Sequence, residues 1–378
     1  MKAKLYSALL LCFALFTSIA VYSQATTYLF IGSYTNGKPG KGIYVYSFNT
    51  SNGQLKKVCS ANNVTNPSYI TLSHDGKFVY ACTETLRSDA GSMSSFSFDD
   101  KKGALTFINK QANGVNPVYA IVDASNRWLI SANYTIGAVS FFSINKDGSL
   151  APFSKITQFD GKSINKERQE RSHIHSIVFS PDQHYIFLPD LGADRIWRFR
   201  FDPTKDPPVS DTSIADTRAV PGSGPRHFVF HPYLSYAYCI EELSGTVQAY
   251  AYTDGRLNTI QRIAAHYKKH KGDHSSADIH ISPDGRFLYA SNRGEENNIA
   301  TFSIDRYTGK LKLIGIQSTS GDHPRNFIID PDGRFLLVAN QISGDVVVFK
   351  RNLQTGLLIK TGIKIKVPGA SCLQIHSY

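Results

Sequence analysis

The chain of 378 residues is 42% hydrophobic and 12% aromatic but only 19% charged, a composition that excludes an intrinsically disordered protein and is ample for a packed core. Its formal net charge of +11 is not concentrated in a long basic run, and no DNA- or RNA-binding signature accompanies it. The charge therefore argues for solubility and attraction of anionic small molecules, and against nucleic acid as a partner.

The first element in chain order is a secretory signal peptide, predicted over residues 1–25. Lys2 and Lys4 precede an apolar run that starts near Leu5, and small residues close the segment. An uncleaved membrane anchor is the alternative, because apolar runs of about 18 residues or more can span a bilayer. No second apolar run follows. We therefore expect an exported protein, periplasmic or secreted, with no stable membrane association once the signal is cleaved.

Four cysteines remain after that segment, namely Cys59, Cys82, Cys239 and Cys372. Four cysteines in a chain of this length do not make a disulfide framework, and none has the spacing of metal ligands. We expect them to be buried or incidental, although one bridge of undetermined pairing stays open.

Beyond residue 25 the chain repeats one unit: a short apolar run, a tight turn and an alternating run rich in Val, Tyr, Phe and Leu. Such a unit is typical of two antiparallel strands joined by a hairpin. Six copies occur, at 66–84, 116–134, 173–191, 224–242, 276–294 and 323–341.

A third strand with an aromatic residue at a fixed place is expected in every repeat, and a Gly-x-Leu turn with a short fourth strand follows most of these. The aromatic residues are Tyr46, Phe96, Phe142, Phe199, Tyr250, Phe302 and Phe349. A four-stranded unit that recurs every 46 to 57 residues is typical of a propeller blade. The seven positions predict an all-β fold, a seven-bladed β-propeller with four antiparallel strands per blade, in one domain over residues 26–378.

The first blade lacks an inner strand of its own. In most blades the inner-strand position precedes the aromatic residue by 24 residues, and counting 24 back from Tyr46 reaches Tyr22, inside the signal peptide. A segment without a repeat partner remains at the C-terminus, Val367–Ile375, and it begins like an inner strand. We predict that this segment completes the first blade and closes the ring, which removes exposed sheet edges. An open array of hairpins is the alternative.

Inner strands line the central channel of a propeller, so residues at one repeat position should converge near its axis. One such column comprises Ser68, Val118, His175, Arg226, Asp278, Arg325 and Gly369, and a second comprises Glu84, Asn133, Asp190, Glu241 or Glu242, Arg293 and Asn340. Imidazole, guanidinium and carboxylate groups around an enclosed axis predict a polar site with perturbed ionisation. Asp278, Asp190 and Asn133 are equally consistent with roles in turns or between blades. His227 is expected to point away from Arg226 and to pack between blades.

These residue types favour hydrolysis of a lactone. A base takes a proton from water, and guanidinium groups stabilise the oxyanion that forms at the carbonyl. Further arginines can hold a phosphate or carboxylate at two points. The sequence contains no Gly-x-Ser-x-Gly elbow and no phosphate-binding glycine loop that would indicate another mechanism.

Several motifs resemble the seven-bladed propeller lactonases of the bacterial 6-phosphogluconolactonase type, which are related to the fungal carboxymuconate lactonizing enzymes. They are FIGSYT (30–35), GIYVYSF (42–48), RQERSHIHSIVFSPD (168–182), PDLGADRI (189–196), GPRHFVFHP (224–232) and SADIHISPDGRFLYASNRG (276–294). The resemblance covers nearly all of the chain after the signal peptide. It implies a hydrolase of an anionic sugar lactone that needs no metal or other cofactor.

By the same resemblance, the catalytic set is His175, Glu242, Arg226 and Arg293, with Glu241 as the alternative to its neighbour. The candidates for substrate binding are Arg168, Gln169, His173, Asp190 and Arg325.

Three alternatives to lactone hydrolysis stay open. The same residues could serve a cycloisomerase of a muconate-type diacid, or a propeller that binds a ligand without turnover. A metal-dependent lactonase would use the column Glu84, Asn133, Asp190 and Glu242, but the nearby arginines would repel a dication.

Overall fold

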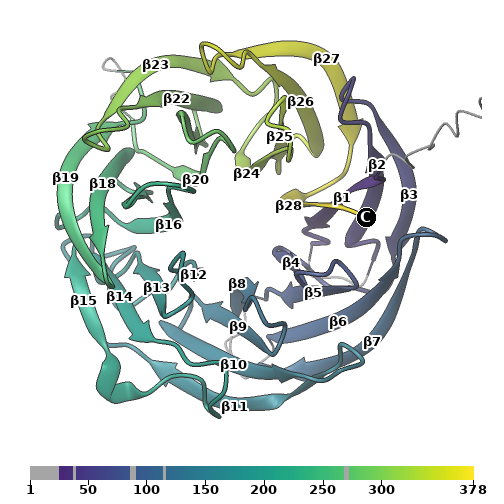
Figure 1. The fold of residues 1–378 in the computed structure, drawn as a ribbon, viewed down its shortest axis with the longest axis horizontal. Helices are drawn as coiled ribbons and strands as arrows, with labels where there is room; N and C mark the ends of the chain where they lie inside the picture. Colours follow the sequence, from purple (N-terminus) through teal and green to yellow (C-terminus); the bar gives the residue numbers. More distant parts are fainter. Residues whose placement is uncertain (1–24, 37–39, 86–90, 114–115, 268–271) are drawn as a thin grey trace, which may run out of the picture.

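The computed structural model describes residues 25–36, 40–85, 91–113, 116–267 and 272–378. Within these residues 28 strands form seven sheets of four antiparallel strands, and the sheets are arranged in a ring (Figure 1). The helical content of this part is one short 3-10 turn, Asp211–Ser213. The prediction of an all-β, seven-bladed propeller is confirmed.

The predicted signal peptide, residues 1–25, lies outside the described residues except for its last position. In the part of the chain that is described, no helix has the length and apolar character needed to cross a membrane. Cys59, Cys82, Cys239 and Cys372 are all free, as expected for a chain without a disulfide framework.

Blade one is built from both ends of the chain. From the centre outward it comprises β28 (Ala370–Ser377), β1 (Thr27–Ser33), β2 (Ile43–Phe48) and β3 (Leu55–Ala61). The other blades follow in chain order, each from the centre outward. Blade two has β4 (Ile70–Leu72), β5 (Phe78–Thr83), β6 (Ser92–Asp99) and β7 (Ala104–Ala112), and blade three has β8 (Pro117–Val122), β9 (Trp128–Asn133), β10 (Ala138–Ile144) and β11 (Leu150–Gln158). Blade four has β12 (Val178–Phe179), β13 (Tyr185–Asp190), β14 (Arg195–Arg200) and β15 (Ala215–Arg218), and blade five has β16 (Pro225–Phe230), β17 (Tyr236–Glu241), β18 (Thr246–Thr253) and β19 (Arg256–Ala264). Blade six has β20 (Ser276–Ile281), β21 (Phe287–Asn292), β22 (Asn298–Ile304) and β23 (Leu311–Ser318), and blade seven has β24 (Pro324–Ile329), β25 (Phe335–Asn340), β26 (Asp345–Arg351) and β27 (Leu358–Lys366).

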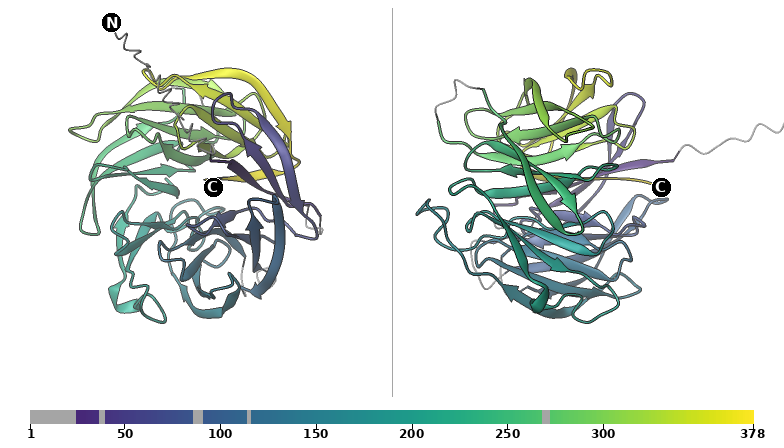
Figure 2. Two further views of the ribbon diagram at one scale, coloured as in Figure 1. Left: turned by 45° about the vertical axis from the view of Figure 1, so that its right-hand side comes forward. Right: turned by 60° about the vertical axis from the view of Figure 1, so that its left-hand side comes forward.

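The C-terminal strand closes the ring as predicted. β28 pairs antiparallel with β1, so that Thr27 lies opposite Ser377 and Gly32 opposite Cys372. Figure 2 shows the two strands side by side in both views. On its other side β28 contacts blade two, where the Ser371 hydroxyl donates to the carbonyl oxygen of Ser68 at 2.8 Å. β28 also contacts blade seven, where the backbone N–H of Leu373 donates to Oδ1 of Asn326 at 2.7 Å, so the C-terminal strand joins blade one to both of its neighbours.

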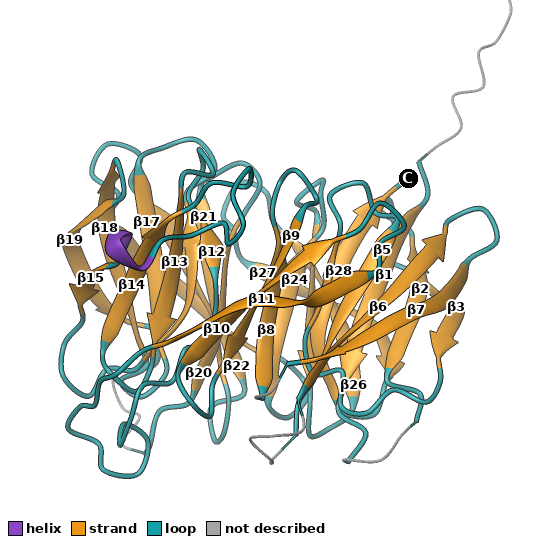
Figure 3. Cartoon of the chain, turned by 90° about the horizontal axis from the view of Figure 1, so that it is seen from below, coloured by secondary structure: helices purple, strands orange, loops and turns teal. Residues whose placement is uncertain are grey.

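The aromatic residues of the third strands form the core of the blades. Each of the seven is at most 7% exposed. In every blade but the fourth, the pairing with the outermost strand shifts register at or next to this residue. Such a bulge bends the outer strand, and Figure 3 shows the strands of the blades slanting across the thickness of the disc, with loops on both faces.

Candidate active site at the centre of the ring

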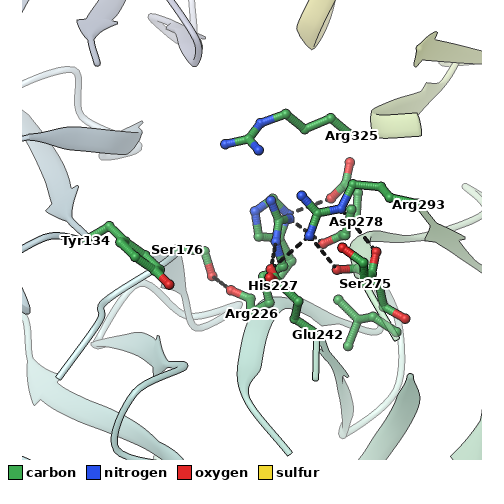
Figure 4. A network of polar contacts seen from close by, with 12 residues as sticks. Tyr134, Ser176, Arg226, His227, Glu242, Ser275, Asp278, Arg293 and Arg325 are labelled. Carbon is green, nitrogen blue, oxygen red and sulfur yellow. Dashed lines mark hydrogen bonds and ion pairs between the residues drawn. The ribbon is translucent and has the colours of Figure 1, made fainter. Parts of the chain in front are cut away.

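Bulges in the inner strands aim side chains at the centre of the ring. In β16 the register skips one residue between Pro225 and His227, so Arg226 has no partner on β17. β24 has the same bulge, which leaves Arg325 unpaired. A bulge re-aims the side chain of the extra residue, and Figure 4 shows both guanidinium groups directed toward the middle of the ring.

Glu242, the residue that follows β17, is the acceptor around which the site is organised. Its Oε2 accepts from Nε of Arg226 at 2.7 Å and lies 3.0 Å from Nη2 of Arg293. Its Oε1 accepts from Nη2 of Arg168 at 2.7 Å. Glu242 is only 4% exposed, and Arg226 only 1%. The site is therefore a buried cluster of three guanidinium groups on one carboxylate.

The side chains of the adjacent residues Glu241 and Glu242 point to different sides of the strand. The backbone N–H of Glu242 donates to the carbonyl oxygen of Gly224, which holds this residue against the start of β16. Successive strand residues point to opposite faces, and Glu241 accordingly turns away and accepts from Nε of Arg262 at 2.8 Å. Of the two candidates, Glu242 is the one that lies with the arginines.

The arginines set the ionisation of the cluster. Burial alone would raise the pKa of Glu242, but Arg293, Arg226 and Arg168 outweigh it and hold that pKa far below its usual range. Burial and the charge of Arg293 lower the pKa of Arg226 to about 9, which leaves its guanidinium charged at neutral pH. Glu242 is thus a permanent anion and a weak base, suited to fixing guanidinium groups rather than to taking a proton.

The two other arginines differ in how firmly they are held. Nε of Arg293 donates to the carbonyl oxygen of Ser275 at 3.0 Å, in addition to its ion pair with Glu242. Arg325 makes a looser ion pair, 3.9 Å from Nη2 to Oε2 of Glu84, and its guanidinium lies 5.4 Å from the centre of the Tyr34 ring. Arg325 is the arginine of the site with the weaker internal contacts.

His175 lies in the segment between β11 and β12. Its backbone N–H donates to the carbonyl oxygen of Pro189 at 3.0 Å, and its ring meets the ring of Tyr134 edge-on at 5.4 Å. Nδ1 is buried and has no hydrogen-bond partner among the described residues. Burial, followed by the charge of Arg226, holds the pKa of His175 well below its usual range, so the imidazole is neutral at neutral pH.

Of the residues expected to contact substrate, Arg168 is the most accessible. Its side chain is 43% exposed while Nη2 binds Glu242, so it forms part of the rim of the cluster. The ring of His173 is stacked on Tyr134 at 4.3 Å, and its Nδ1 lies 2.8 Å from the carbonyl oxygen of the same tyrosine.

Gln169 and Asp190 use their polar atoms within the protein. The amide of Gln169 donates to the carbonyl oxygen of Leu191 at 2.8 Å, and Oδ1 of Asp190 accepts from the backbone N–H of His173 at 2.8 Å. Oδ2 of Asp190 accepts from Nε1 of Trp197 at 2.9 Å. Both residues are completely buried. They shape the loop that carries Arg168 and His175.

The second column of polar residues does not converge on one point. Glu84 accepts from the hydroxyl of Tyr34 at 2.6 Å, and the side-chain amide of Asn133 donates to the hydroxyl of Ser140 at 2.9 Å. In the described ranges no three His, Cys, Asp or Glu side chains are grouped so as to hold a metal ion. The donor set expected for a metal-dependent lactonase is therefore not assembled by these residues.

The prediction that Asp278 occupies the same repeat position as Arg226 was wrong by one residue. The connection from β17 to β18 spans 242–245, whereas the connection from β21 to β22 spans 293–297, one residue longer. Counting back from the aromatic residue of blade six therefore overshoots. Aligned on the hairpin turns, Asp278 corresponds to His227, and the two side chains are in contact, 2.7 Å from Oδ1 to Nδ1.

The cluster and the closed ring together define a propeller with fixed guanidinium groups, an ionised glutamate and a neutral imidazole at its centre. The chain belongs to the seven-bladed β-propeller lactonase family, whose model matches residues 28–375. The family inferred from the sequence motifs is thereby confirmed.

The similarity to individual proteins extends across all seven blades. The 6-phosphogluconolactonase of Formosa agariphila is 43% identical over 352 residues, which is 93% of this chain and 99% of the relative. The 6-phosphogluconolactonase of Bacillus subtilis is 33% identical over 349 residues, 91% of this chain and 97% of the relative. Among solved structures, the periplasmic gluconolactonase of Pseudomonas aeruginosa matches with a TM-score of 0.86 at 34% identity, covering 93% of this chain and 99% of its own.

Proposed function

We propose that this chain is a carboxylic-ester hydrolase that opens sugar lactones to aldonic acids at the centre of the ring. The observation that carries the proposal is a pair of guanidinium groups, Arg226 and Arg293, fixed on one buried carboxylate close to a neutral imidazole. The relatives agree with it, since two are named 6-phosphogluconolactonases and one a periplasmic gluconolactonase.

The arginines serve the charge that develops in the reaction. Attack of water on a lactone carbonyl places a negative charge on the carbonyl oxygen, and preorganised donors in a buried site stabilise it. Nε of Arg226 is bound to Glu242 and Nη1 to the carbonyl oxygen of Ala277, which fixes the plane of the guanidinium. Arg293 is fixed in the same way by Glu242 and Ser275. Their remaining N–H groups are the donors for the oxyanion.

The proton of the attacking water needs an acceptor that is free at neutral pH. Glu242 is saturated by three guanidinium groups and is a weak base, so its part in the reaction is to hold Arg226 and Arg293. A neutral imidazole has the required lone pair. The imidazole singled out by the sequence, His175, has its pKa lowered by burial and by Arg226 and is neutral.

The substrate is an anion. Four guanidinium groups lie near the centre of the ring, the three on Glu242 and that of Arg325, against the three carboxylates of Glu242, Glu84 and Asp278. The excess of positive charge in a largely buried place favours a ligand that carries a phosphate or a carboxylate. Arg325 is the natural contact for that group, because its own ion pair with Glu84 is the longest in the cluster.

The place of action that fits the N-terminal sequence is outside the cytoplasm. Residues 1–25 have the pattern of a cleavable secretory signal, and a solved relative is described as periplasmic. We therefore propose that the mature chain works in the periplasm or after secretion.

Turnover of a panel of lactones tests the function. Purified protein is assayed in a pH-stat against D-glucono-δ-lactone, its 6-phosphate and a muconolactone, with and without a chelator. We expect acid release from the sugar lactones well above the spontaneous rate, and the same rate after chelation. Ligand binding without turnover would make the chain a binding propeller, and activity that is lost on chelation and restored by a divalent cation would contradict the metal-free reading.

A further inference from the structure

In blades four and five, the residue that follows His175 or Arg226 joins its blade to the next one. In blade four this residue is Ser176, whose hydroxyl donates to the carbonyl oxygen of Arg226 in blade five at 2.7 Å. In blade five it is His227, whose partner is not a backbone group but the carboxylate of Asp278 in blade six. The link between blades five and six therefore joins two titratable side chains beside the arginine cluster (Figure 4).

Asp278 is held as an ionised acceptor with both oxygens fixed. Oδ2 lies 3.0 Å from Nε2 of His280 and accepts from the backbone N–H of Phe327 at 3.1 Å and from the side-chain amide of Asn326. Burial opposes ionisation, but His280 and His227 outweigh it and hold the pKa of Asp278 far below its usual range. A carboxylate constrained in this way imposes an orientation on the imidazole that it contacts.

That contact determines the tautomer of His227. An ionised carboxylate can only accept, so the hydrogen of the neutral imidazole sits on Nδ1 and the lone pair on Nε2. Burial and the charge of Arg226 lower the pKa of His227 to about 4, so the ring is neutral at neutral pH. The contact with Asp278 is made by Nδ1 and leaves Nε2 free of that carboxylate, and the side chain keeps 10% exposure. His227 thus presents a proton acceptor of fixed direction.

The position of His227 is that of a group that can act on substrate. It follows Arg226 directly in the chain, and its ring centre is 5.5 Å from the ring centre of His175 and 5.5 Å from that of Tyr119. His175 differs in one respect: its Nδ1 is buried without a partner among the described residues, so no neighbour fixes which nitrogen carries the hydrogen.

We propose that His227 is the general base of the lactone hydrolysis and that Asp278 is its positioning residue; this rests on the proposed function. Nε2 takes a proton from water as the water oxygen bonds to the lactone carbonyl carbon, and the carbonyl electron pair moves onto its oxygen beside the guanidinium groups. Collapse of this intermediate breaks the bond between the carbonyl carbon and the ring oxygen. The ring oxygen takes the proton back from His227, and a hydroxy acid leaves.

The test compares His227→Gln with His280→Gln. Both histidines contact the carboxylate of Asp278, but the ring of His280 packs edge-on against Phe327, 4.8 Å between centres, rather than against His175. We expect H227Q to lower kcat for D-glucono-δ-lactone by about 10²- to 10⁴-fold, the usual contribution of a general base. H280Q should lower kcat much less, because Asp278 keeps its contacts with Phe327 and Asn326 and the base itself is intact. Added imidazole should restore part of the activity of His227→Ala.

The pH profile separates a base from a structural link. The charged or titratable groups that face His227 are Arg226 on its own strand, His175 before β12, Tyr119 in β8, and Asp278 and His280 in β20. A base must be neutral to act, so kcat/KM of the wild type should fall only as the pH drops through about 4. Asp278→Asn removes the carboxylate that raises the pKa of His227, so the acid limb should move to lower pH while kcat falls. If the contact between His227 and Asp278 were only structural, Asp278→Asn would lower the rate equally at every pH.

The outcomes are distinct. An active H227Q, or an equal loss in H227Q and H280Q, overturns the assignment of the base. If circular dichroism shows that H227Q does not fold, the wild-type profile decides, since an acid limb well above pH 4 or its absence down to about pH 3 contradicts a base of this pKa. A wild type without any lactone turnover refutes the hydrolase itself, whereas an active wild type with an active H227Q refutes only the role of His227.

Discussion

Replacing Glu242 with glutamine removes a buried negative charge while keeping the size of the side chain. Arg226 and Arg293, 1% and 6% exposed, then lose their shared counter-ion. Removing one partner of a buried ion pair typically costs about 3–5 kcal/mol of unfolding free energy. The contact with Arg168 adds little, because that side chain is 43% exposed. An unfolding entropy of about 2.1 cal/mol/K per residue amounts to roughly 0.7 kcal/mol/K for a domain of this size, so Tm should fall by about 4–7 °C.

The same substitution should impair hydrolysis, because both oxyanion donors lose the group that fixes them. Loss of a preorganised donor lowers kcat by about 10²- to 10³-fold. Glu241→Gln is the matched control: it removes an adjacent buried carboxylate whose partner, Arg262, has a side chain that is 32% exposed and can turn to solvent. We expect E241Q to keep its kcat and to lose less stability in scanning calorimetry. If E242Q has the kcat and Tm of the wild type, Glu242 does not organise the arginines.

Three further predictions follow from particular side chains. His175→Ala should lower kcat by about 10- to 10²-fold, less than H227Q, with an unchanged circular dichroism spectrum, because a residue at the ring centre carries little of the packing; a collapsed spectrum would make His175 structural. Arg325→Met should raise KM for a phosphorylated lactone by about 10-fold or more and change KM for the unphosphorylated one much less, since a hydrogen bond to a charged group is worth about 1.5–3 kcal/mol; equal effects on both substrates would refute the anion contact. Asp330→Ser should stabilise the protein above pH 6 but not at pH 4. Burial raises the pKa of Asp330 from 3.8 to about 6, so the wild type loses up to about 3 kcal/mol of stability as the pH rises between these values. Tm scans in which the variant shows no pH-dependent gain would contradict this.

The fold could be predicted because its signals are local and repeated. Alternation of period two, hairpin turns and one aromatic residue per third strand recur in each blade, so seven copies reinforce one interpretation. Ring closure followed from the absence of one inner strand at the N-terminus and the presence of an unmatched segment, Val367–Ile375, at the other end.

Only those site residues that occupy regular positions of a repeat could be predicted from the sequence. Arg226 and Glu242 sit at defined places in a regular hairpin, and the structure brings them together. Asp278 was assigned to the wrong repeat position because counting back from the aromatic residue crosses the connection 293–297, which has one extra residue. The pairing of His227 with Asp278 depends on how adjacent blades meet, which no property of either segment alone determines.

The contacts that Gln169 and Arg325 make within the protein could not be predicted from the sequence either. Gln169 belongs to a motif that suggested substrate contact, yet its amide is used by the carbonyl oxygen of Leu191. Arg325 meets Tyr34 and Glu84 only because the last blade closes onto the first. Contacts of this kind arise from closure of the ring and carry no signature in the local sequence.

The closing strand also dictates when the protein can become complete during synthesis. β28 supplies the innermost strand of blade one, and its residues Ala370–Ser377 follow the other 27 described strands in the chain, so they are translated after all of them. A nascent chain can pair the strands within the other six blades, but one edge of β1 stays unpaired until β28 has been synthesised. A chain that stops before β28 therefore cannot complete blade one, whereas a chain that contains β28 joins its last described strand to its first.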